Sequence, residues 1–193
     1  MKTIVYKDFE NGSIDFLEDL CNSLMEFQAK HAKIRQDIMA SMNFKNRLLP
    51  DYHNTERKYI AVAYDGEKPV GFTFASVSRV SKESIKAKPS WANELDGLGF
   101  YPADYDVPKN IGTYKLLFVD PDYRGLNIGG QLSDMVMTWL NSHNDVEDLW
   151  VFVANGNEKV GRFYEKYGFN FSHNVFNGFI EAYCQEANKA SDC

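Results

Sequence analysis

The sequence predicts an α/β domain built on one mixed, mostly antiparallel sheet with helices on its flanks. Apolar residues recur at helical spacing between positions 14 and 42. Two β-rich segments then surround a turn at 65–68, which predicts an antiparallel hairpin. In the second half of the chain, strand-like apolar runs alternate with helical patterns, and this order is typical of a sheet covered by helices.

Length and composition set the class of protein. The 193 residues fit one domain, residues 1–193, and 44% hydrophobic with 25% charged residues excludes a disordered chain. A net charge of -6 without a long Lys/Arg run argues against nucleic acid as a partner. No run of about 18 apolar residues and no signal peptide are present, so we expect a cytoplasmic protein with no membrane partner.

The N-terminal quarter is predicted to hold a short strand and two helices. The strand covers 4–6, and Ser13 is a good N-cap for the next helix, because its hydroxyl can accept a hydrogen bond from the first turn. Apolar residues over 14–27 follow at helical spacing. A second helix covers 34–42, and Pro50 is expected to end the helical region.

The middle of the chain contains the hairpin and an irregular insertion. Strands over 59–64 and 70–74 form the hairpin. Prolines and glycines interrupt every pattern over 81–112, so this segment is predicted to be an irregular insertion between the third and fourth strands, of the kind that is usually functional. Regular structure resumes with a strand over 114–119 and a helix over 130–141.

The C-terminal part is predicted to contain a buried strand, a helix and a hairpin. The apolar run 149–153 suits a strand covered on both faces. A helix over 158–167 ends at Gly168, a residue type favoured just after helices. The segment 174–180 is predicted to be a hairpin around a type I′ turn at Asn177-Gly178.

The Gly-rich loop between the predicted strand over 114–119 and the predicted helix over 130–141 indicates a phosphate site. Glycines let the backbone approach a ligand, and free N–H groups at a helix start attract an anion. Arg124 adds a guanidinium whose fork geometry suits phosphate. No Lys-Ser/Thr follows the last glycine, so the loop is not a Walker A phosphate loop. The glycine spacing also differs from the GxGxxG fingerprint of dinucleotide-binding folds, so that loop type is excluded too.

The same loop resembles the acyl-CoA signature of the GNAT superfamily of acetyl-CoA-dependent N-acetyltransferases, Arg/Gln-x-x-Gly-x-Gly/Ala. Arg124, Ile128 and Gly129 fit that pattern. Asn127 stands where the first glycine is expected. Because Asn tolerates the left-handed backbone region better than most residues, we expect the loop to keep its shape.

A second stretch, 157–169, resembles the downstream helix of the same family, Asn-x-x-Ala-x-x-Phe-Tyr-x-x-x-Gly-Phe. Val160 replaces the usual Ala, and Gly161 is an unusual residue for a helix interior, where it costs about 1 kcal/mol relative to Ala. The two motifs occur in the family's order, separated by one helix and one buried strand.

The resemblance implies a GNAT-like acyl-CoA N-acyltransferase fold with acetyl-CoA as acyl donor and no metal. It implies that the strand ending at Val119 separates from the strand ending at Val153. Pantetheine would pair with the exposed strand edge, and a backbone N–H near Val119 would polarise the thioester carbonyl. Tyr164 would be catalytic, donating to the departing thiolate. The implied cofactor contacts are Leu117, Phe118, Val119, Arg124, Gly125, Leu126, Asn127, Ile128, Gly129, Gly130, Asn157 and Tyr164.

The predicted activity is direct N-acetylation of a primary amine on a small-molecule or peptide acceptor, by an enzyme that could be a homodimer. The acidic balance of the chain favours a cationic acceptor weakly. Two alternatives stay open: a noncatalytic acyl-CoA-binding or regulatory module, and a transferase of longer acyl groups. Asn127 and the absence of a strand carboxylate support the noncatalytic module.

The general base is not evident in the sequence. Many relatives place a Glu on the strand before the loop, where this chain has Thr113-Tyr114-Lys115. Asp104, Asp106 and Glu26 are candidates that are more typical of solvated surface carboxylates. Tyr101, Tyr105, Phe72 and Phe74 could line an acceptor pocket, although alternating aromatics on a strand usually pack in a core.

Histidine and cysteine patterns give no sign of a metal centre or a covalent mechanism. His31, His53, His143 and His173 lack metal-ligand spacing, although the helix that carries His31 is expected to border the acceptor cleft. Cys21, Cys184 and Cys193 form no CxxC pair and have no activating neighbour, so we interpret them as reduced bystanders.

Overall fold

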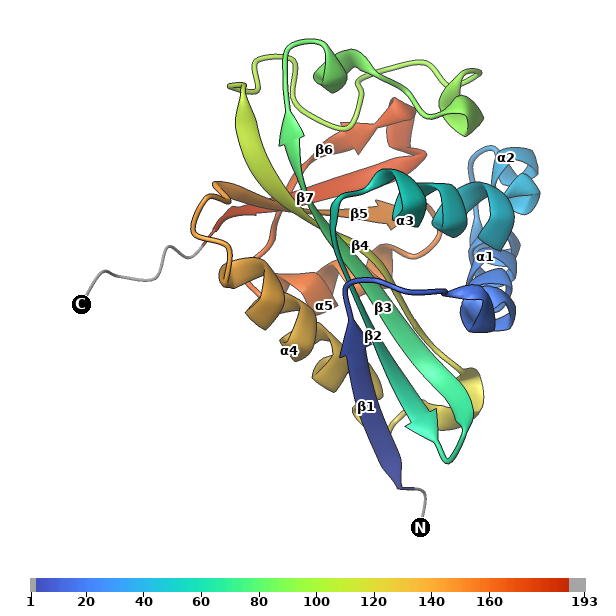
Figure 1. Ribbon diagram of the computed structural model, residues 1–193. Coiled ribbons are helices and arrows are strands. Elements are labelled where there is room, and N and C mark those ends of the chain that lie inside the picture. Colours follow the sequence, from blue (N-terminus) through green and yellow to red (C-terminus); the bar gives the residue numbers. More distant parts are fainter. Residues whose placement is uncertain (1–2, 188–193) are drawn as a thin grey trace.

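A computed structural model describes residues 3–187 and shows a seven-stranded sheet (Figure 1). The strand order is β1-β2-β3-β4-β5-β7-β6, and among these strands only the β4–β5 pair is parallel. This confirms the predicted mixed, mostly antiparallel sheet. The strands are β1 (Ile4–Phe9), β2 (Arg57–Asp65), β3 (Lys68–Val80), β4 (Lys109–Val119), β5 (Asp148–Ala154), β6 (Asn170–Val175) and β7 (Ile180–Glu186).

Helices cover both faces of the sheet, and each face has its own apolar core. Leu24 of the first helix and Phe74 of β3 belong to the core on one face, and Leu132 of the fourth helix and Val151 of β5 belong to the core on the other. The first three helices and the fourth accordingly lie on opposite sides of the sheet (Figure 1). The helices are α1 (Glu18–His31), α2 (Gln36–Ser41), α3 (Leu49–Asn54), α4 (Ile128–Asn141) and α5 (Gly161–Glu165).

The N-terminal helical region is longer than predicted. The prediction that Ser13 is an N-cap is wrong: its hydroxyl accepts the Asp15 N–H at 3.3 Å, but the N-cap of the 3-10 turn over Asp15–Leu17 is Ile14, and the α-helix begins only at Glu18. The prediction that Pro50 ends the region is wrong. A π-helical turn over Phe44–Leu48 continues into α3, and Pro50 lies in the first turn of α3, the part of a helix where proline is best tolerated.

The insertion is shorter than predicted, because β4 already begins at Lys109. Val80 pairs with Lys109, so residues 109–112 belong to β4, and the irregular segment covers 81–108. Polar residues at these strand ends hide their β structure in the sequence, since cross-strand pairing rather than propensity fixes them there.

The C-terminal hairpin exists, and its predicted turn is present: Asn177 and Gly178 are the central residues with φ 56° and 89°, as a type I′ turn requires, and the Phe179 N–H donates to the Phe176 carbonyl at 3.2 Å. Val175 pairs with Ile180, which leaves a four-residue connection. Phe176, Asn177 and Gly178 all have positive φ, and the Phe176 N–H donates to the Leu98 carbonyl at 2.7 Å. The insertion therefore anchors this turn, a long-range contact that local turn chemistry does not reveal.

The helix after β5 explains its unusual glycine. It consists of a 3-10 turn over Glu158–Val160 and then α5, and Gly168 ends it at φ +92° as predicted. A Cβ on Gly161 would collide with the hydroxyl of Tyr183 on β7. Gly161 therefore lets α5 approach the sheet closely.

The described residues can be compared with the sequence for membrane spans, metal-binding groups and cysteines. No described helix is both long and apolar enough to cross a membrane. Within residues 3–187, no group of three or more His, Cys, Asp or Glu side chains could hold a metal ion. Burial raises the pKa of the Cys21 thiol to about 12, so it is a poor nucleophile. Neither Cys21 nor Cys184 forms a disulfide, and Cys193 lies outside the described residues.

The buried side chain of Asn155 ties the α1–α2 connection to the end of β5. Its Oδ1 accepts the backbone N–H groups of Lys33 at 2.6 Å and Ile34 at 2.8 Å. Its Nδ2 donates to the carbonyls of Ile34 and Phe179. One amide thus satisfies four backbone groups from two distant segments.

Replacing Asn155 with Ala should lower the free energy of unfolding by about 3 kcal/mol, because buried backbone groups would lose their partners. The melting temperature should fall by roughly 6–12 °C. Thermal unfolding followed by circular dichroism measures this. Asn170→Ala is the matched control, since exposed Asn170 makes one local hydrogen bond to Gly168. Equal melting temperatures for the two variants would contradict the role given to Asn155.

Candidate active site

The parallel strands β4 and β5 separate halfway along their length. They pair from Ile111 with Asp148 to Tyr114 with Val151, and the pairing ends there. At the same point β4 carries a bulge, because Ala75 pairs with Tyr114 and Phe74 with Leu116, leaving Lys115 as the extra residue. A bulge bends its strand, so it moves the rest of β4 away from β5. The separation implied by the family resemblance is present in the structure.

A cavity of about 670 Å³, here called the donor cavity, lies beside this separation. Its walls come from β4, the Gly-rich loop, α1 and the α5 region. Of the residues implied to contact the cofactor, those lining it are Leu117, Phe118, Val119, Arg124, Gly125, Asn127, Ile128, Gly129, Asn157 and Tyr164. Leu126 and Gly130 lie outside the lining; Leu126 is half exposed, and the Gly130 carbonyl accepts a hydrogen bond from Tyr167.

The loop before α4 has the expected left-handed turn. Asn127 has φ 57° and ψ 20°, so Asn does replace glycine here without changing the sign of φ. The side chain of Asn127 lies over Gly130, where a Cβ would collide with it. By contrast, a Cβ on Gly129 would have its nearest neighbours at 3.9 Å on Val119 and 4.0 Å on Leu117. The first N–H groups of α4 lack intrahelical acceptors and lie at this wall of the cavity.

Arg124 connects the loop to α1. Its Nε donates to the carbonyl of Val119 at 3.3 Å, and its guanidinium lies 5.1 Å from the ring centre of Phe27. Phe27 also lines the donor cavity. The positive charge of Arg124 is therefore held beside the end of β4.

Tyr164 of α5 is buried against other aromatic rings. Its ring lies edge-on to Tyr114 at 5.3 Å and to Phe163 at 5.4 Å, and its side chain lines the donor cavity. Burial raises the pKa of the Tyr164 phenol well above its ordinary value, so the hydroxyl stays protonated at neutral pH. Within the described residues this hydroxyl forms no hydrogen bond, so its O–H can donate to a ligand.

A second cavity of about 450 Å³, here called the acceptor cavity, adjoins the first. The two share the lining residues Gln28, Lys115, Leu116, Phe152 and Ala154. Lys115 Nζ lies 2.6 Å from Asp51 Oδ1, and Arg47 Nη1 lies 3.3 Å from Asp51 Oδ2. Burial opposes the charged form of Asp51, but Lys115 and Arg47 outweigh it and lower the pKa of this carboxyl. Burial lowers the pKa of Lys115.

A family model described as acetyltransferase (GNAT) family matches residues 17–169. The chain belongs to the GNAT acetyltransferase family. Its fold agrees with solved structures that it covers almost fully. Arabidopsis thaliana NAA60 with a bisubstrate analogue has a TM-score of 0.58 and 14% identity, covering 97% of this chain and 100% of NAA60. A GNAT-family acetyltransferase from Staphylococcus aureus has a TM-score of 0.55 and 14% identity, covering 95% and 100%. No curated protein has a significant sequence match to the chain.

As a GNAT acetyltransferase, the chain is an acyltransferase whose sheet departs from the family pattern at one instructive place. The β4 position where many relatives have a Glu is occupied by Thr113-Tyr114-Lys115. The nearest carboxylate to Lys115 is supplied by α3 as Asp51. Sequence reasoning missed Asp51 because it ended the helical region at Pro50. Buried Phe44, Leu48 and Tyr52, four residues apart, are the periodic signal that could have extended it.

The other carboxylates considered in the sequence lie away from both cavities of this GNAT enzyme. Asp104, Asp106 and Glu26 are exposed and line neither. His31 is exposed too, with its Nδ1 at 2.7 Å from the Phe27 carbonyl. The aromatic candidates divide: Tyr101 lines the acceptor cavity, Tyr105 donates to Asp148 at 2.6 Å instead, and Phe72 and Phe74 are fully buried in the core.

Proposed function

We propose that this acetyltransferase uses acetyl-CoA and transfers its acetyl group directly to a primary amine of a small-molecule or peptide acceptor. The observation that supports this most strongly is the pair of adjoining cavities that meet where β4 and β5 separate. One cavity borders the Gly-rich loop and the other does not. A donor and an acceptor could therefore enter from different sides and meet at the shared wall. The NAA60 structures, solved with acetyl-CoA and with a bisubstrate analogue, are consistent with this use of the fold.

The donor cavity provides the groups that a CoA thioester needs. The part of β4 beyond Tyr114 has no pairing with β5, so its backbone can bind pantetheine amides as an added strand would. The Arg124 N–H donates to the Pro121 carbonyl, so the backbone N–H groups of Gly125 and of residues 127–129, with the Arg124 guanidinium, are the groups that suit the pyrophosphate. Asn157 lies on the opposite wall, where it would contact the pantetheine arm.

The chemistry assigns Tyr164 one task. When the amine attacks, the C–S bond of the thioester breaks and negative charge develops on sulfur, which a nearby O–H can protonate. A backbone N–H near Val119 would polarise the thioester carbonyl. No described cysteine lines either cavity, which supports direct attack over an acetyl-cysteine intermediate.

Acetyl-CoA should raise the melting temperature of the protein. Ligand at about 100 times its dissociation constant adds ~2.7 kcal/mol, which is a rise of roughly 5–11 °C for a domain of this size. Thermal unfolding with acetyl-CoA, free CoA and a longer acyl-CoA measures this. A larger rise with the longer acyl-CoA would favour a transferase of longer acyl groups, and a rise without CoA release on any amine would favour a binding module. No rise with any of the three would contradict the proposed donor site.

A further inference from the structure

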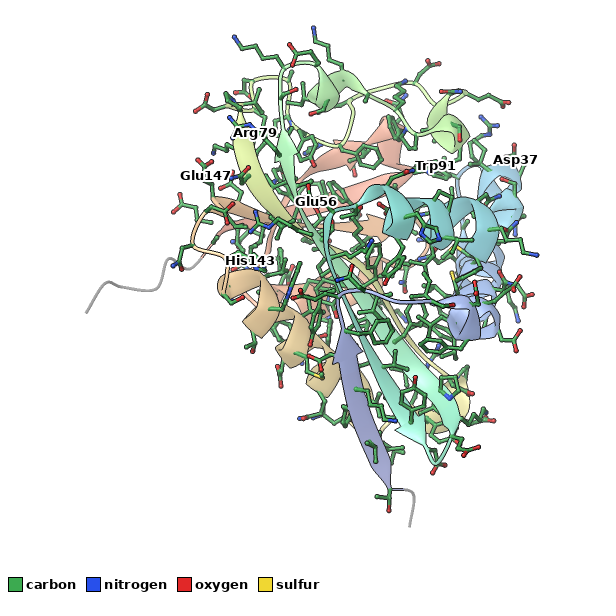
Figure 2. The ribbon with its side chains drawn as sticks, in the orientation of Figure 1. Asp37, Glu56, Arg79, Trp91, His143 and Glu147 are labelled. Carbon is green, nitrogen blue, oxygen red and sulfur yellow. The ribbon has the colours of Figure 1, made fainter. Side chains whose placement is uncertain are left out.

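The acceptor cavity has an aromatic wall made mostly by the insertion. Trp91, Phe100 and Tyr101 come from the insertion, and Phe152 comes from β5. Phe100 lies 5.2 Å from Phe152 and 6.2 Å from Trp91, and Tyr101 lies 6.2 Å from Phe152 between ring centres. Trp91 lies on the part of the insertion that is next to the α2–α3 region (Figure 2). This wall suits a large apolar or aromatic group of an acceptor.

The other wall is charged, and its sign is positive. Among the described lining residues, the charged side chains are Arg47, Asp51 and Lys115, so the cavity carries one net positive charge in a chain of net charge -6. Each of these side chains is 20–25% exposed, and all three line the cavity. The charge of the acceptor cavity is therefore opposite to that of the whole protein.

The two cations have hydrogen-bond donors to spare. Arginine has five N–H donors and lysine three. Within the described part of the chain, the Arg47 side chain donates once, to Asp51 Oδ2, and the Lys115 ammonium donates once, to Asp51 Oδ1. Asp51 is thus shared between two cations, while both cations can still bind a second carboxylate. An anion fits this wall better than a further cation does.

The position of Lys115 sets how far that anion can be from the reacting amine. Lys115 and Phe152 line both cavities, so the positive wall adjoins the donor cavity. An acceptor that reaches the acetyl group must then carry its amine and its anionic group close together. An α-amino acid does so, because both groups are bonded to one carbon atom.

We propose that the acceptor is a free α-amino acid with a large apolar or aromatic side chain. Its carboxylate binds Arg47 and Lys115, its side chain packs on the aromatic wall, and its amine points to the donor cavity. This inference rests on the proposed acetyl transfer and replaces the cationic acceptor that overall charge favoured. A polyamine would be repelled by the two cations, Arg47 and Lys115, and the carboxylate nearby, Asp51, is already paired with both of them.

The reaction balances without a further reactant. The neutral amine forms the new C–N bond to the acetyl carbon as the C–S bond breaks. The nitrogen releases one proton to solvent, and the sulfur gains one from Tyr164, which solvent reprotonates. The products are an N-acetyl amino acid and free CoA.

The test compares acceptors in matched pairs that differ by the carboxylate alone. With acetyl-CoA, CoA release is measured for L-leucine, L-methionine, L-phenylalanine and L-tryptophan. The partners are 3-methylbutylamine, 3-(methylthio)propylamine, 2-phenylethylamine and tryptamine, with spermidine as a cationic acceptor. For at least one pair, kcat/KM should be about 10- to 100-fold higher for the amino acid, as expected for charge-assisted hydrogen bonds.

A variant assigns the effect to the positive wall. Arg47→Gln should raise the KM of the preferred amino acid about 10- to 100-fold while changing the KM of its decarboxylated partner less than about threefold. Lys45→Gln is the matched control, because Lys45 lies on the same π-helical turn with its side chain 75% exposed. It should leave both KM values unchanged. Melting temperatures of both variants check that they fold. If Arg47→Gln does not fold, the comparison of each amino acid with its decarboxylated partner on the unaltered protein decides the test.

The outcomes separate this inference from the proposed function. If acetyl-CoA raises the melting temperature but no amino acid of the panel releases CoA, or the decarboxylated amines or spermidine react better, the α-amino acid assignment is overturned. If acetyl-CoA does not bind, the proposed transfer is overturned and the inference with it.

Discussion

Tyr164→Phe should lower kcat by about 10²- to 10⁴-fold while leaving acetyl-CoA affinity within about threefold of the original. The substitution removes one oxygen atom, and that hydroxyl makes no hydrogen bond to any described residue. The ring keeps its edge-on contacts with Tyr114 and Phe163, so the free energy of unfolding should not change. The loss should therefore fall on the step in which the thiolate departs. Single-turnover kinetics and calorimetric binding of acetyl-CoA measure the two effects separately.

The pH dependence gives a second readout for Tyr164. Because burial raises its pKa well above the ordinary value, the phenol stays protonated across the neutral range and gives no falling limb there. The rate should instead rise with pH as the acceptor amine loses its proton. Tyr183→Phe is a matched control, since the Tyr183 hydroxyl lies outside both cavities and donates to Glu181. A Tyr164→Phe enzyme with full kcat would reduce Tyr164 to a packing residue.

The parts of the fold that sequence predicts well are those with strong local patterns. The hairpin of β2 and β3, the buried strand β5 and the helix α4 each follow from periodicity or turn chemistry within about 15 residues. The same holds for the Gly-rich loop, because Gly125 and Asn127 have positive φ and both residue types tolerate it.

The acceptor side could not be predicted in this way, because distant segments build it. Asp51 meets Lys115 across 64 residues of chain, and the bulge that places Lys115 depends on the register between β3 and β4. A bulge adds one residue and shifts the alternation of side chains, but both faces of β4 carry apolar residues, so the shift is not visible in the sequence. The donor cavity can therefore be predicted from two local sequence motifs, whereas the acceptor cavity depends on how α3 and the insertion pack on the sheet.

Gly129→Glu should abolish acetyl-CoA binding while the protein still folds. Gly129 has no positive φ, and a Cβ there finds its nearest neighbour at 3.9 Å, so the backbone accepts a side chain. A carboxylate in the first turn of α4 is also favourable to the helix, because it lies at the positive end of the dipole. The same carboxylate would enter the donor cavity at the wall proposed for the pyrophosphate, where like charges cost several kcal/mol. Affinity should fall at least ~100-fold.

Two further variants divide that loss between volume and charge. Gly129→Ala adds only the Cβ, which the cavity wall accommodates, so it should weaken acetyl-CoA binding least. Gly129→Gln has nearly the volume of Glu without the charge, and the difference in binding between Gln and Glu measures the repulsion of the pyrophosphate. Isothermal titration calorimetry gives the affinities, and thermal unfolding without ligand checks that all three variants fold. If Gly129→Glu bound acetyl-CoA as tightly as the unaltered protein, the phosphates would have to lie away from the start of α4. The cavity beside β4 would then need a different ligand.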